Sequence, residues 1–438
     1  MKASLHAYRL ICSLEGQARR FLGYGRALGL EESVCFGWPD LAASRSRSLV
    51  LFVGTIGEFN AVRSLINAYR ERWPDDRLVL LTGQEQYADP LHKAIPDSII
   101  ALPTWRSPRM LDRFLALAQP RLVAFAEGPS LHGRFPIRLE LPLPAACLYH
   151  GLPLVVLNAR VYERHLPSRI DRLENIGFAG LHRDAVSRWF VPDASTEEEL
   201  RRAGAPAPRI SMVGDLKFDN AASEPEVPPA GLAGILEGLA AQGGEILVGG
   251  SVNELEDQIS LIEGWRELRQ TGQDVRLIIA PRYLQFPHVL RGLRGYLEQE
   301  GLSYQLRSEI ADKAPEADVF IIDVFGELRF YYGISTLCYV GHNHGVLEPL
   351  RYGKPTVVAD DWRRDHPSFP LYDKIVKAGA VVHVKDKSRL GEAFIRILRD
   401  SDYTSGVLGQ AAALISQNAG AAQRIMDELQ ETVVAASQ

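Results

Sequence analysis

The 438-residue chain has few cysteines, and those it has form no motif. Cys12, Cys35, Cys147 and Cys338 lie far apart in the sequence, and none of them belongs to a CxxC pair. A disulfide framework or a structural zinc site needs grouped cysteines, so we expect neither. Reduced, scattered thiols of this kind favour a cytoplasmic protein.

The chain also lacks long hydrophobic runs and a dominant sign of charge. No stretch approaches the roughly 20 apolar residues that span a bilayer, so we expect any membrane contact to be peripheral. A formal net charge of -5 provides no global attraction to nucleic acid. The absence of a GxGxxG fingerprint and of a Walker loop disfavours the usual dinucleotide and ATP sites.

What the chain does have is length and a regular apolar pattern. Hydrophobic residues make up 46% and charged residues 24%, which is typical of a soluble globular protein, and 438 residues exceed one ordinary core. Short apolar runs alternate with helical patterns, which indicates a parallel sheet covered on both faces. The first half has such runs at 48–55, 77–82, 98–102, 121–126, 153–158 and 210–214.

A change in composition divides the chain. Residues 220–231 are rich in Pro, Ala, Ser and Glu and are predicted to form a linker. The strand pattern then restarts at 245–249, 275–280, 318–322, 336–341, 355–359 and 380–384. We therefore predict two doubly wound, Rossmann-like α/β domains facing a cleft, residues 1–222 and 223–438, the second ending in helices. Ligands of such sheets bind at the carboxyl ends of the strands.

Three turns of the first half place chemically useful side chains after strands. Glu58, after the first strand, is positioned to accept a proton from an attacking hydroxyl. The spacing of Thr55 and Glu58 also fits a capping box, so a purely structural role is the alternative. Arg160 and Lys217 are candidates to hold an anionic sugar or acceptor phosphates, and the alternative for both is a solvated loop charge.

The second half has turns that suit a nucleotide. Ser251 ends a strand–Gly–Gly–Ser turn predicted to open a helix, a good phosphate site, although Ser251 and Glu254 also fit a capping box. Arg282 follows the next strand and can pair with phosphate through two parallel hydrogen bonds. Glu348 is placed to bind ribose hydroxyls.

A third turn and an HxH pair complete the set. The amides of residues 326–328 are predicted to open a helix and face the nucleotide. The spacing of His342 and His344 is compatible with a metal site. No third ligand is evident in the sequence, so we expect no metal.

Taken in order, the motifs GEFNA, FAEGPS, NAR, GDLKFD, GGS, PR, DVFGEL and LEP span about residues 53–355. The series resembles the transferases of 3-deoxy-D-manno-octulosonic acid (Kdo) in lipopolysaccharide assembly. The resemblance implies an inverting, metal-independent GT-B glycosyltransferase without a cofactor. Such enzymes move Kdo from CMP-Kdo to a lipid A precursor, at the cytoplasmic face of the inner membrane.

The resemblance also implies roles for single residues. Glu58 matches the catalytic base. The positions that match the acceptor and donor sides of the cleft are Glu127, Asn158, Arg160 and Lys217. The positions that match the nucleotide-binding region are Ser251, Arg282, Gly326, Glu327, Leu328, His344 and Glu348.

The donor half departs from the family pattern. The family's PRHPER is replaced by residues 281–286, PRYLQF, and in GGHNxLEP His344 keeps its place while Gly345 replaces Asn. Two alternatives to a Kdo transferase therefore remain. One is a GT-B enzyme with another nucleotide sugar, such as a UDP-sugar transferase or epimerase. The other is a non-catalytic GT-B-like binding protein.

The N-terminal segment departs from the family as well. Members of the family often begin with a hydrophobic anchor, and this segment has none. Arginines near Leu10 and Ile11 could form a weak interfacial helix on a membrane, and an ordinary basic surface helix is the alternative. These arginines are Arg9, Arg19, Arg20 and Arg26.

Overall fold

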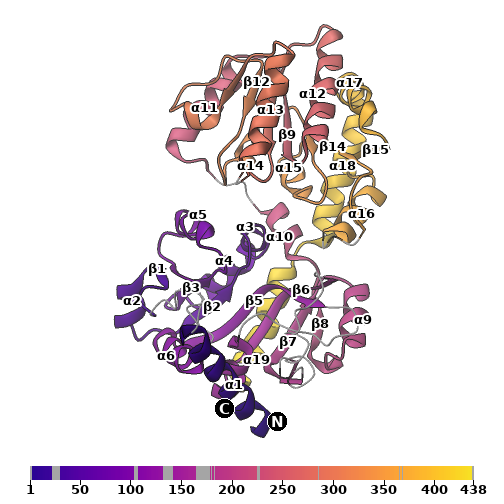
Figure 1. The fold of residues 1–438 in the computed structure, drawn as a ribbon. Helices are drawn as coiled ribbons and strands as arrows, with labels where there is room; N and C mark the ends of the chain where they lie inside the picture. Colours follow the sequence, from indigo (N-terminus) through magenta and orange to yellow (C-terminus); the bar gives the residue numbers. More distant parts are fainter. Residues whose placement is uncertain are drawn as a thin grey trace. The chain divides into compact units, whose positions relative to one another are not determined.

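The fold was obtained as a computed structural model, and it divides the chain into two compact units (Figure 1). Unit 1 comprises Met1–Asn220 and Asn418–Gln438, and unit 2 comprises Ala221–Gln417. The structure describes residues 2–436 except 22–29, 103–106, 132–141, 164–177, 179, 182, 224–226, 285, 365 and 367. No helix in this described part is both long enough and apolar enough to cross a membrane.

Unit 1 is built on an eight-stranded sheet, as far as the chain is described, with the order β1-β4-β3-β2-β5-β6-β7-β8. Every neighbouring pair is parallel except β1 and β4, which are antiparallel. The strands are β1 (Val34–Phe36), β2 (Ser48–Phe52), β3 (Arg77–Leu81), β4 (Ile99–Ala101), β5 (Pro120–Leu131), β6 (Leu154–Glu163), β7 (Val186–Val191) and β8 (Ile210–Met212).

Both faces of this sheet are buried, as the unbroken apolar runs predict. Along β2, Val50 and Phe52 enter one core cluster, and Leu49 and Leu51 enter the other, because successive strand residues point to opposite faces. The helices over the first cluster are α2 (Trp38–Ala43), α6 (Pro108–Ala118), α7 (Leu143–His150) and α9 (Ala194–Arg202). Those over the second are α3 (Ile56–Ala61), α4 (Arg63–Arg72), α5 (Ala88–Ala94), α10 (Leu216–Ala222) and α19 (Ala421–Ala436). The N-terminal helix α1 (Lys2–Phe21) packs beside α6 and α7.

Unit 2 repeats the design with a fully parallel sheet of seven described strands, in the order β11-β12-β10-β9-β13-β14-β15. The strands are β9 (Glu245–Val252), β10 (Val275–Pro281), β11 (Tyr304–Leu306), β12 (Val319–Ile321), β13 (Leu337–Val340), β14 (Thr356–Ala359) and β15 (Val382–Val384). Leu247 packs under α12 (Leu255–Gln270), α13 (Pro287–Gln299) and α17 (Leu390–Arg399). Its neighbour Val248 packs on the other face, under α11 (Ala230–Ala241) and α14 (Leu328–Ile334). Unit 2 also contains α15 (Leu347–Arg351) and α16 (Phe369–Lys377), and α18 (Ser401–Asn418) ends at the boundary.

The C-terminal helix returns to unit 1. The carboxylate of Asp219 accepts hydrogen bonds from the backbone N–H groups of Gly420, Ala421 and Ala422 at the start of α19, the last at 2.6 Å. In Figure 1 the yellow helix α19 lies among the indigo and magenta elements of unit 1. The sequence placed all of 223–438 in the second domain, whereas residues 418–438 pack with the first.

The predicted fold class is confirmed, since each unit is a parallel, doubly wound α/β sheet. The predicted strands all occur, within a few residues at their ends. Three short or mixed strands were missed: β1, β7 and β11. They have only three to six residues and include polar or partly exposed positions, so their apolar signal is weak.

Candidate functional site

Glu58 lies in the first turn of α3, directly after β2. Its backbone N–H donates to the hydroxyl of Thr55, the N-cap, at 3.1 Å. Its carboxylate turns back and accepts the backbone N–H of Gly54 at 2.7 Å. The structural alternative from the sequence is therefore present, because a capping arrangement forms. The same hydrogen bonds fix the carboxylate at the carboxyl end of β2, where a base would be needed.

The four sugar-binding candidates of unit 1 gather in one network. Asn158 Nδ2 donates to Glu127 Oε1 at 3.3 Å and to Asp215 Oδ1 at 3.2 Å. Lys217 Nζ lies 2.9 Å from Glu127 Oε1, and Arg160 donates to Asp215 in an ion pair. These groups come from the neighbouring strands β5 and β6 and from the turn that opens α10, so the topology unites residues up to 90 positions apart.

This network is deeply buried and strongly coupled. Burial acts to lower the pKa of Arg160, but the charges of Asp215, Glu127 and Asp193 outweigh it and raise that pKa. Burial acts to raise the pKa of Asp215, but Arg160 and Lys217 outweigh it and hold that pKa below its ordinary value. Both groups are therefore ionised at neutral pH. A solvated loop charge, the alternative considered for Arg160, is wrong, since the residue is 5% exposed.

In unit 2 the Gly–Gly–Ser segment lies within the last residues of β9 and is tightly packed, so the predicted turn opening a helix at Ser251 is wrong. A Cβ on Gly250 would overlap the Tyr332 hydroxyl, and one on Gly341 would overlap the backbone of Ser251. Ser251 itself has a φ of 52°. The expected Ser251–Glu254 capping box does not form, because Ser251 lies within β9 and α12 begins only at Leu255.

Arg282 and Glu348 lie near this turn. The backbone N–H of Arg282 donates to the carbonyl of Val252 at 2.9 Å, and its guanidinium lies 5.1 Å from the ring centre of Tyr283. Burial raises the pKa of Glu348, against the opposing charges of Arg329, Arg282 and Arg351. Part of Glu348 reaches solvent, so its carboxyl lies at the border of a basic, desolvated region.

An ion pair within unit 2 stabilises the turn formed by the GEL segment, residues 326–328. Arg307 binds both carboxylate oxygens of Glu327, through Nε at 2.7 Å and Nη2 at 3.1 Å. Gly326 has a φ of 86°, which the tight turn requires and which favours glycine. Leu328 packs closely on Gly250, since a Cβ at Gly250 would lie 3.2 Å from the Leu328 side chain. The carboxylate of Glu327 thus orients α14 through Arg307, and its contact with a nucleotide stays a prediction.

The HxH segment does not form a metal site in the described part of the chain, where no three His, Cys, Asp or Glu side chains gather around a point. The His344 ring packs edge-on against His366, with 5.6 Å between ring centres. His342 instead faces Asp361, whose Oδ2 lies 3.3 Å from His342 Nδ1. This hydrogen bond raises the pKa of His342, although burial opposes it.

Beneath His342 lies a buried ionic cluster that sequence reasoning did not find. Lys387 Nζ lies 2.6 Å from Asp361 Oδ2 and 2.7 Å from Asp257 Oδ1. The Tyr339 hydroxyl donates to Asp257 at 2.6 Å, and Asp257 is 1% exposed. The cluster ties β13, α12 and the segments after β14 and β15 together beneath the predicted nucleotide loop.

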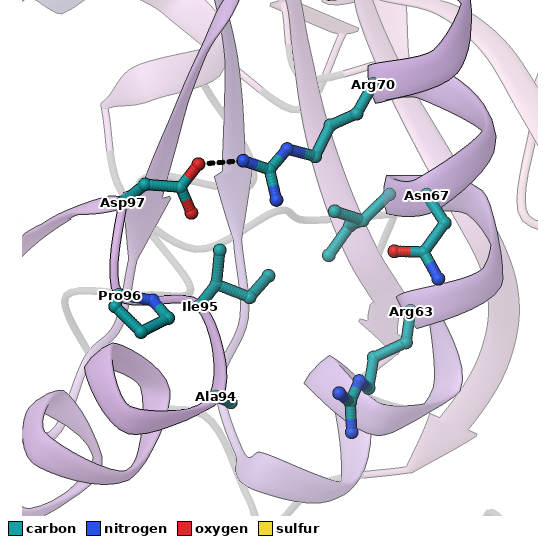
Figure 2. Close-up of a pocket in the computed structure, with 8 residues that line it drawn as sticks. Arg63, Asn67, Arg70, Ala94, Ile95, Pro96 and Asp97 are labelled. Carbon is teal, nitrogen blue, oxygen red and sulfur yellow. Dashed lines mark hydrogen bonds and ion pairs between the residues drawn. The ribbon is translucent and has the colours of Figure 1, made fainter. Parts of the chain in front are cut away.

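A polar cavity of about 150 Å³ contains none of the predicted site residues. It is lined by Arg63, Ile66, Asn67 and Arg70 of α4 and by residues 94–97 (Figure 2). Figure 2 shows Arg70 reaching across to Asp97 as an ion pair. Residues 94–97 precede β4, so the cavity borders the amino end of that strand, away from the edge where such sheets bind ligands.

Two residues at the site were missed by the assignment of roles from sequence. Asp215 stands inside the GDLKFD motif, and Arg329 directly follows GEL. Each adjoins a motif that was recognised, which was the available signal. Their contacts depend on residues distant in the chain, so no local pattern revealed them.

The two parallel, doubly wound units have the GT-B fold. The solved UDP-GlcNAc 2-epimerase of Neisseria meningitidis, bound to UDP-GlcNAc, has the same fold. It aligns with a TM-score of 0.53 and 14% identity, over 88% of this chain and 100% of that one.

Sequence comparison finds similarity to one family of transferases. A family model described as 3-deoxy-D-manno-octulosonic-acid transferase (kdotransferase) matches residues 30–220. The 3-deoxy-D-manno-octulosonic acid transferase of Haemophilus influenzae is 23% identical over 87% of this chain and 86% of its own length. That of Bordetella pertussis is 25% identical over 66% of each chain. The chain is thus similar to Kdo transferases over most of its length, as its motifs indicated.

Proposed function

We propose that this chain transfers Kdo, or a related 2-keto sugar acid, from CMP-Kdo to a lipid A precursor or a related glycan. The observation that carries the proposal is the network of Glu127, Asn158, Arg160 and Lys217. These residues were assigned to the sugar side from three separate motifs, and they lie in contact through Asp215. A purely structural cluster would not have to draw on the same motif positions.

The proposed reaction is a single in-line displacement. Glu58 takes the proton of the acceptor hydroxyl, whose oxygen then forms a bond to the anomeric carbon of Kdo. The bond from that carbon to the phosphate oxygen breaks, and CMP leaves with the electron pair. Attack opposite the leaving group inverts the anomeric configuration.

The proposed donor site stabilises the departing nucleotide. Arg282 pairs with the phosphate, and Ser251 lies at the end of β9 beside it. Charge that develops on the phosphate is stabilised most where fixed donors already point at it. Glu348 accepts hydrogen bonds from the ribose hydroxyls, and Gly326, Leu328 and His344 line the nucleotide.

The network in unit 1 suits an anionic sugar for an electrostatic reason. Arg160 is 5% exposed, and Asp215 balances its charge. The role of Arg160 is therefore to position the other residues of the network. The side chain of Lys217 is 25% exposed and pairs with Glu127. A sugar carboxylate would compete with Glu127 for Lys217, which makes Lys217 the cation that meets the substrate.

We further propose that α1 brings the protein to the membrane surface. Leu5, Tyr8 and Cys12 bury one side of α1 in a small core cluster. On the remaining surface, Leu10 and Leu14 are 62% and 56% exposed, and Ile11 lies beside them. An exposed apolar stripe on a helix is suited to insertion at the level of lipid headgroups.

The test of the reaction is a transfer assay with CMP-Kdo generated in situ and a tetraacyl lipid A precursor, read by mass spectrometry. A mass gain of one or more Kdo units supports the proposal and counts the sugars added. No gain, while CMP still raises the melting temperature, would mean a different sugar or acceptor. No gain and no stabilisation by CMP would overturn the Kdo donor.

A UDP-sugar enzyme is the second candidate, and the loop after β10 favours it. In that loop, Tyr283 has a φ of 61° and is 43% exposed, at a position where the family has histidine. Thermal melts with CMP and with UDP separate the two candidates, because a bound ligand raises stability by mass action.

A further inference from the structure

The helical segment that carries Glu58 is interrupted at Val62. Helix α3 ends one residue before Val62, and α4 begins one residue after it. In an unbroken α-helix the backbone N–H of Ser64 would donate to the carbonyl of Asn60, four residues earlier. Residues 58–66 contain no proline or glycine, so the commonest causes of a break in a helix are absent from this segment. The cause of the interruption therefore comes from outside it.

The side-chain carboxamide of Asn220 lies between that donor and that acceptor. The backbone N–H of Ser64 donates to Asn220 Oδ1 at 3.0 Å, and Asn220 Nδ2 donates to the carbonyl of Asn60. A side chain inserted into the ladder of i→i−4 hydrogen bonds bends a helix at that point. The same carboxamide satisfies a carbonyl at the end of α3 and an N–H at the start of α4. Asn220 thus sets the direction of α3 relative to α4.

Asn220 is held in place by contacts of α10 that do not involve α3. Its neighbour Asp219 accepts hydrogen bonds from the backbone at the start of α19, one of them at 2.6 Å. The first turn of α10 carries Lys217, which pairs with Glu127 in the sugar-side network at 2.9 Å. One short helix therefore fixes both the cation of that network and the direction of the helix that carries Glu58.

We propose that Asn220 is a positioning residue for Glu58, because it keeps α3 bent toward the direction that the reaction needs. This rests on the proposed function, in which Glu58 is the base. A general base acts only within hydrogen-bond reach of the hydroxyl that it deprotonates, and a displacement of about 1 Å can cost about 10²-fold in rate. Without the carboxamide, the N–H of Ser64 and the carbonyl of Asn60 can pair directly, which would straighten the segment and redirect α3.

The experiment compares Asn220→Ala with the unchanged full chain in the Kdo transfer assay. We expect kcat to fall by about 10²-fold. The affinity for CMP, whose predicted site lies in unit 2, should change by less than about twofold in calorimetric titration. The melting temperature should stay close to that of the unchanged protein, because the two released backbone groups can pair with each other. Asn67→Ala, at an exposed asparagine of α4, is the matched control and should keep its kcat.

Crystal structures of the unchanged protein and of Asn220→Ala give a second measurement that does not depend on the reaction. We expect the bend between α3 and α4 to be lost in the variant. A bend that persists would overturn the inference, and so would an unchanged kcat. A loss of CMP affinity as large as the loss of kcat would also overturn it, since that pattern indicates a general disturbance of the fold.

A further variant covers the case in which Asn220→Ala does not fold. Asn220→Asp keeps the size of the side chain and the acceptor for Ser64, but it places an oxygen against the carbonyl of Asn60. Its kcat should also fall, and full activity would overturn the inference. Failure of the proposed function has a different sign, because the unchanged protein would then transfer no Kdo. In that case the bend in the two crystal structures decides whether Asn220 directs α3.

Discussion

Arg160 and Asp215 form an ion pair with side chains only 6% and 7% exposed, at the centre of the candidate sugar site. The two residues are 55 positions apart in the sequence. Asn158 joins them, because its Nδ2 donates a hydrogen bond to Asp215 Oδ1 at 3.2 Å. Two buried charges of opposite sign are tolerable together and costly apart. The pair therefore fixes the geometry on which Lys217 and Glu127 depend.

Removing Asp215 should destabilise unit 1 severely. Asp215→Ala leaves the buried Arg160 without its counter-ion, and we expect a loss of about 3–5 kcal/mol in the free energy of unfolding. Urea unfolding followed by circular dichroism measures this loss. The double variant Arg160→Met/Asp215→Leu should be more stable than Asp215→Ala alone, because it removes both charges. A double variant as unstable as the single one would contradict the account.

The Arg160–Asp215 ion pair should make the stability of the protein depend on pH in the acidic range. The pKa of Asp215 is lowered in the folded protein, so its stabilisation is present above the unfolded value, about 3.9, and is lost as the pH falls through the folded value. Asp215→Asn should therefore flatten the fall in stability below about pH 5, relative to the unchanged protein. Melting temperatures across the acidic range provide the comparison.

Glu58 can be tested apart from its capping role. Glu58→Gln keeps an oxygen that can accept the Gly54 N–H but removes the basic carboxylate. We expect the melting temperature to stay close to that of the unchanged protein while turnover falls by about 10²–10⁴-fold. Thr55→Ala is the control, since it removes the cap and should cost about 1 kcal/mol with little effect on turnover. Full activity of a folded Glu58→Gln variant would exclude Glu58 as the base.

His342 should make unit 2 sensitive to pH near neutrality. Its pKa is raised by the hydrogen bond to Asp361 and by the charges of Glu254 and Asp257, and Lys387 shares both aspartates. Stabilisation by the protonated ring is thus complete below about pH 6.5 and is lost as the pH rises through the folded pKa. His342→Gln should be less stable than the unchanged protein at low pH, and the difference should shrink at high pH.

The measurement is the melting temperature from about pH 5.5 to about pH 8.5, the range that brackets histidine titration. His383→Gln is the matched control, since His383 Nε2 lies 3.7 Å from Asp360, which directly follows the neighbouring strand β14. If the melting temperatures of the two variants depend on pH in the same way, the cluster around Asp361 does not cause the pH dependence.

The exposed stripe of α1 should govern binding to lipid. Replacing Leu10, Ile11 and Leu14 by Gln should weaken binding to anionic vesicles by more than about 10-fold, given the roughly 1.5–3 kcal/mol of each large apolar side chain buried. Co-sedimentation with vesicles measures this. Val227→Gln removes an apolar side chain that is 88% exposed in unit 2 and should have no effect. Equal binding by the triple variant would exclude α1 as the contact.

The sequence predicted the strands well where they are long and apolar. The run 48–52 is buried at every position and was found, whereas β1 and β11 have three residues each and were missed. The candidate residues at the carboxyl ends of strands were found for the same reason, although Glu127, Asn158, Arg160 and Ser251 lie within β5, β6 and β9 and not in turns after them. The helical segment that follows β2 is divided at Val62 into α3 and α4.

By itself, the sequence determined the class of fold, the order of the motifs and the family that these motifs resemble. These features are local: apolar runs specify strands, and turn residues lie next to them. The tertiary structure alone decided that Asp215 neutralises Arg160, that Arg307 holds Glu327, and that Asp219 caps the returning helix α19. Each of these contacts joins residues from separate elements, and only the packing of the sheet and its helices brings such charges within bonding distance.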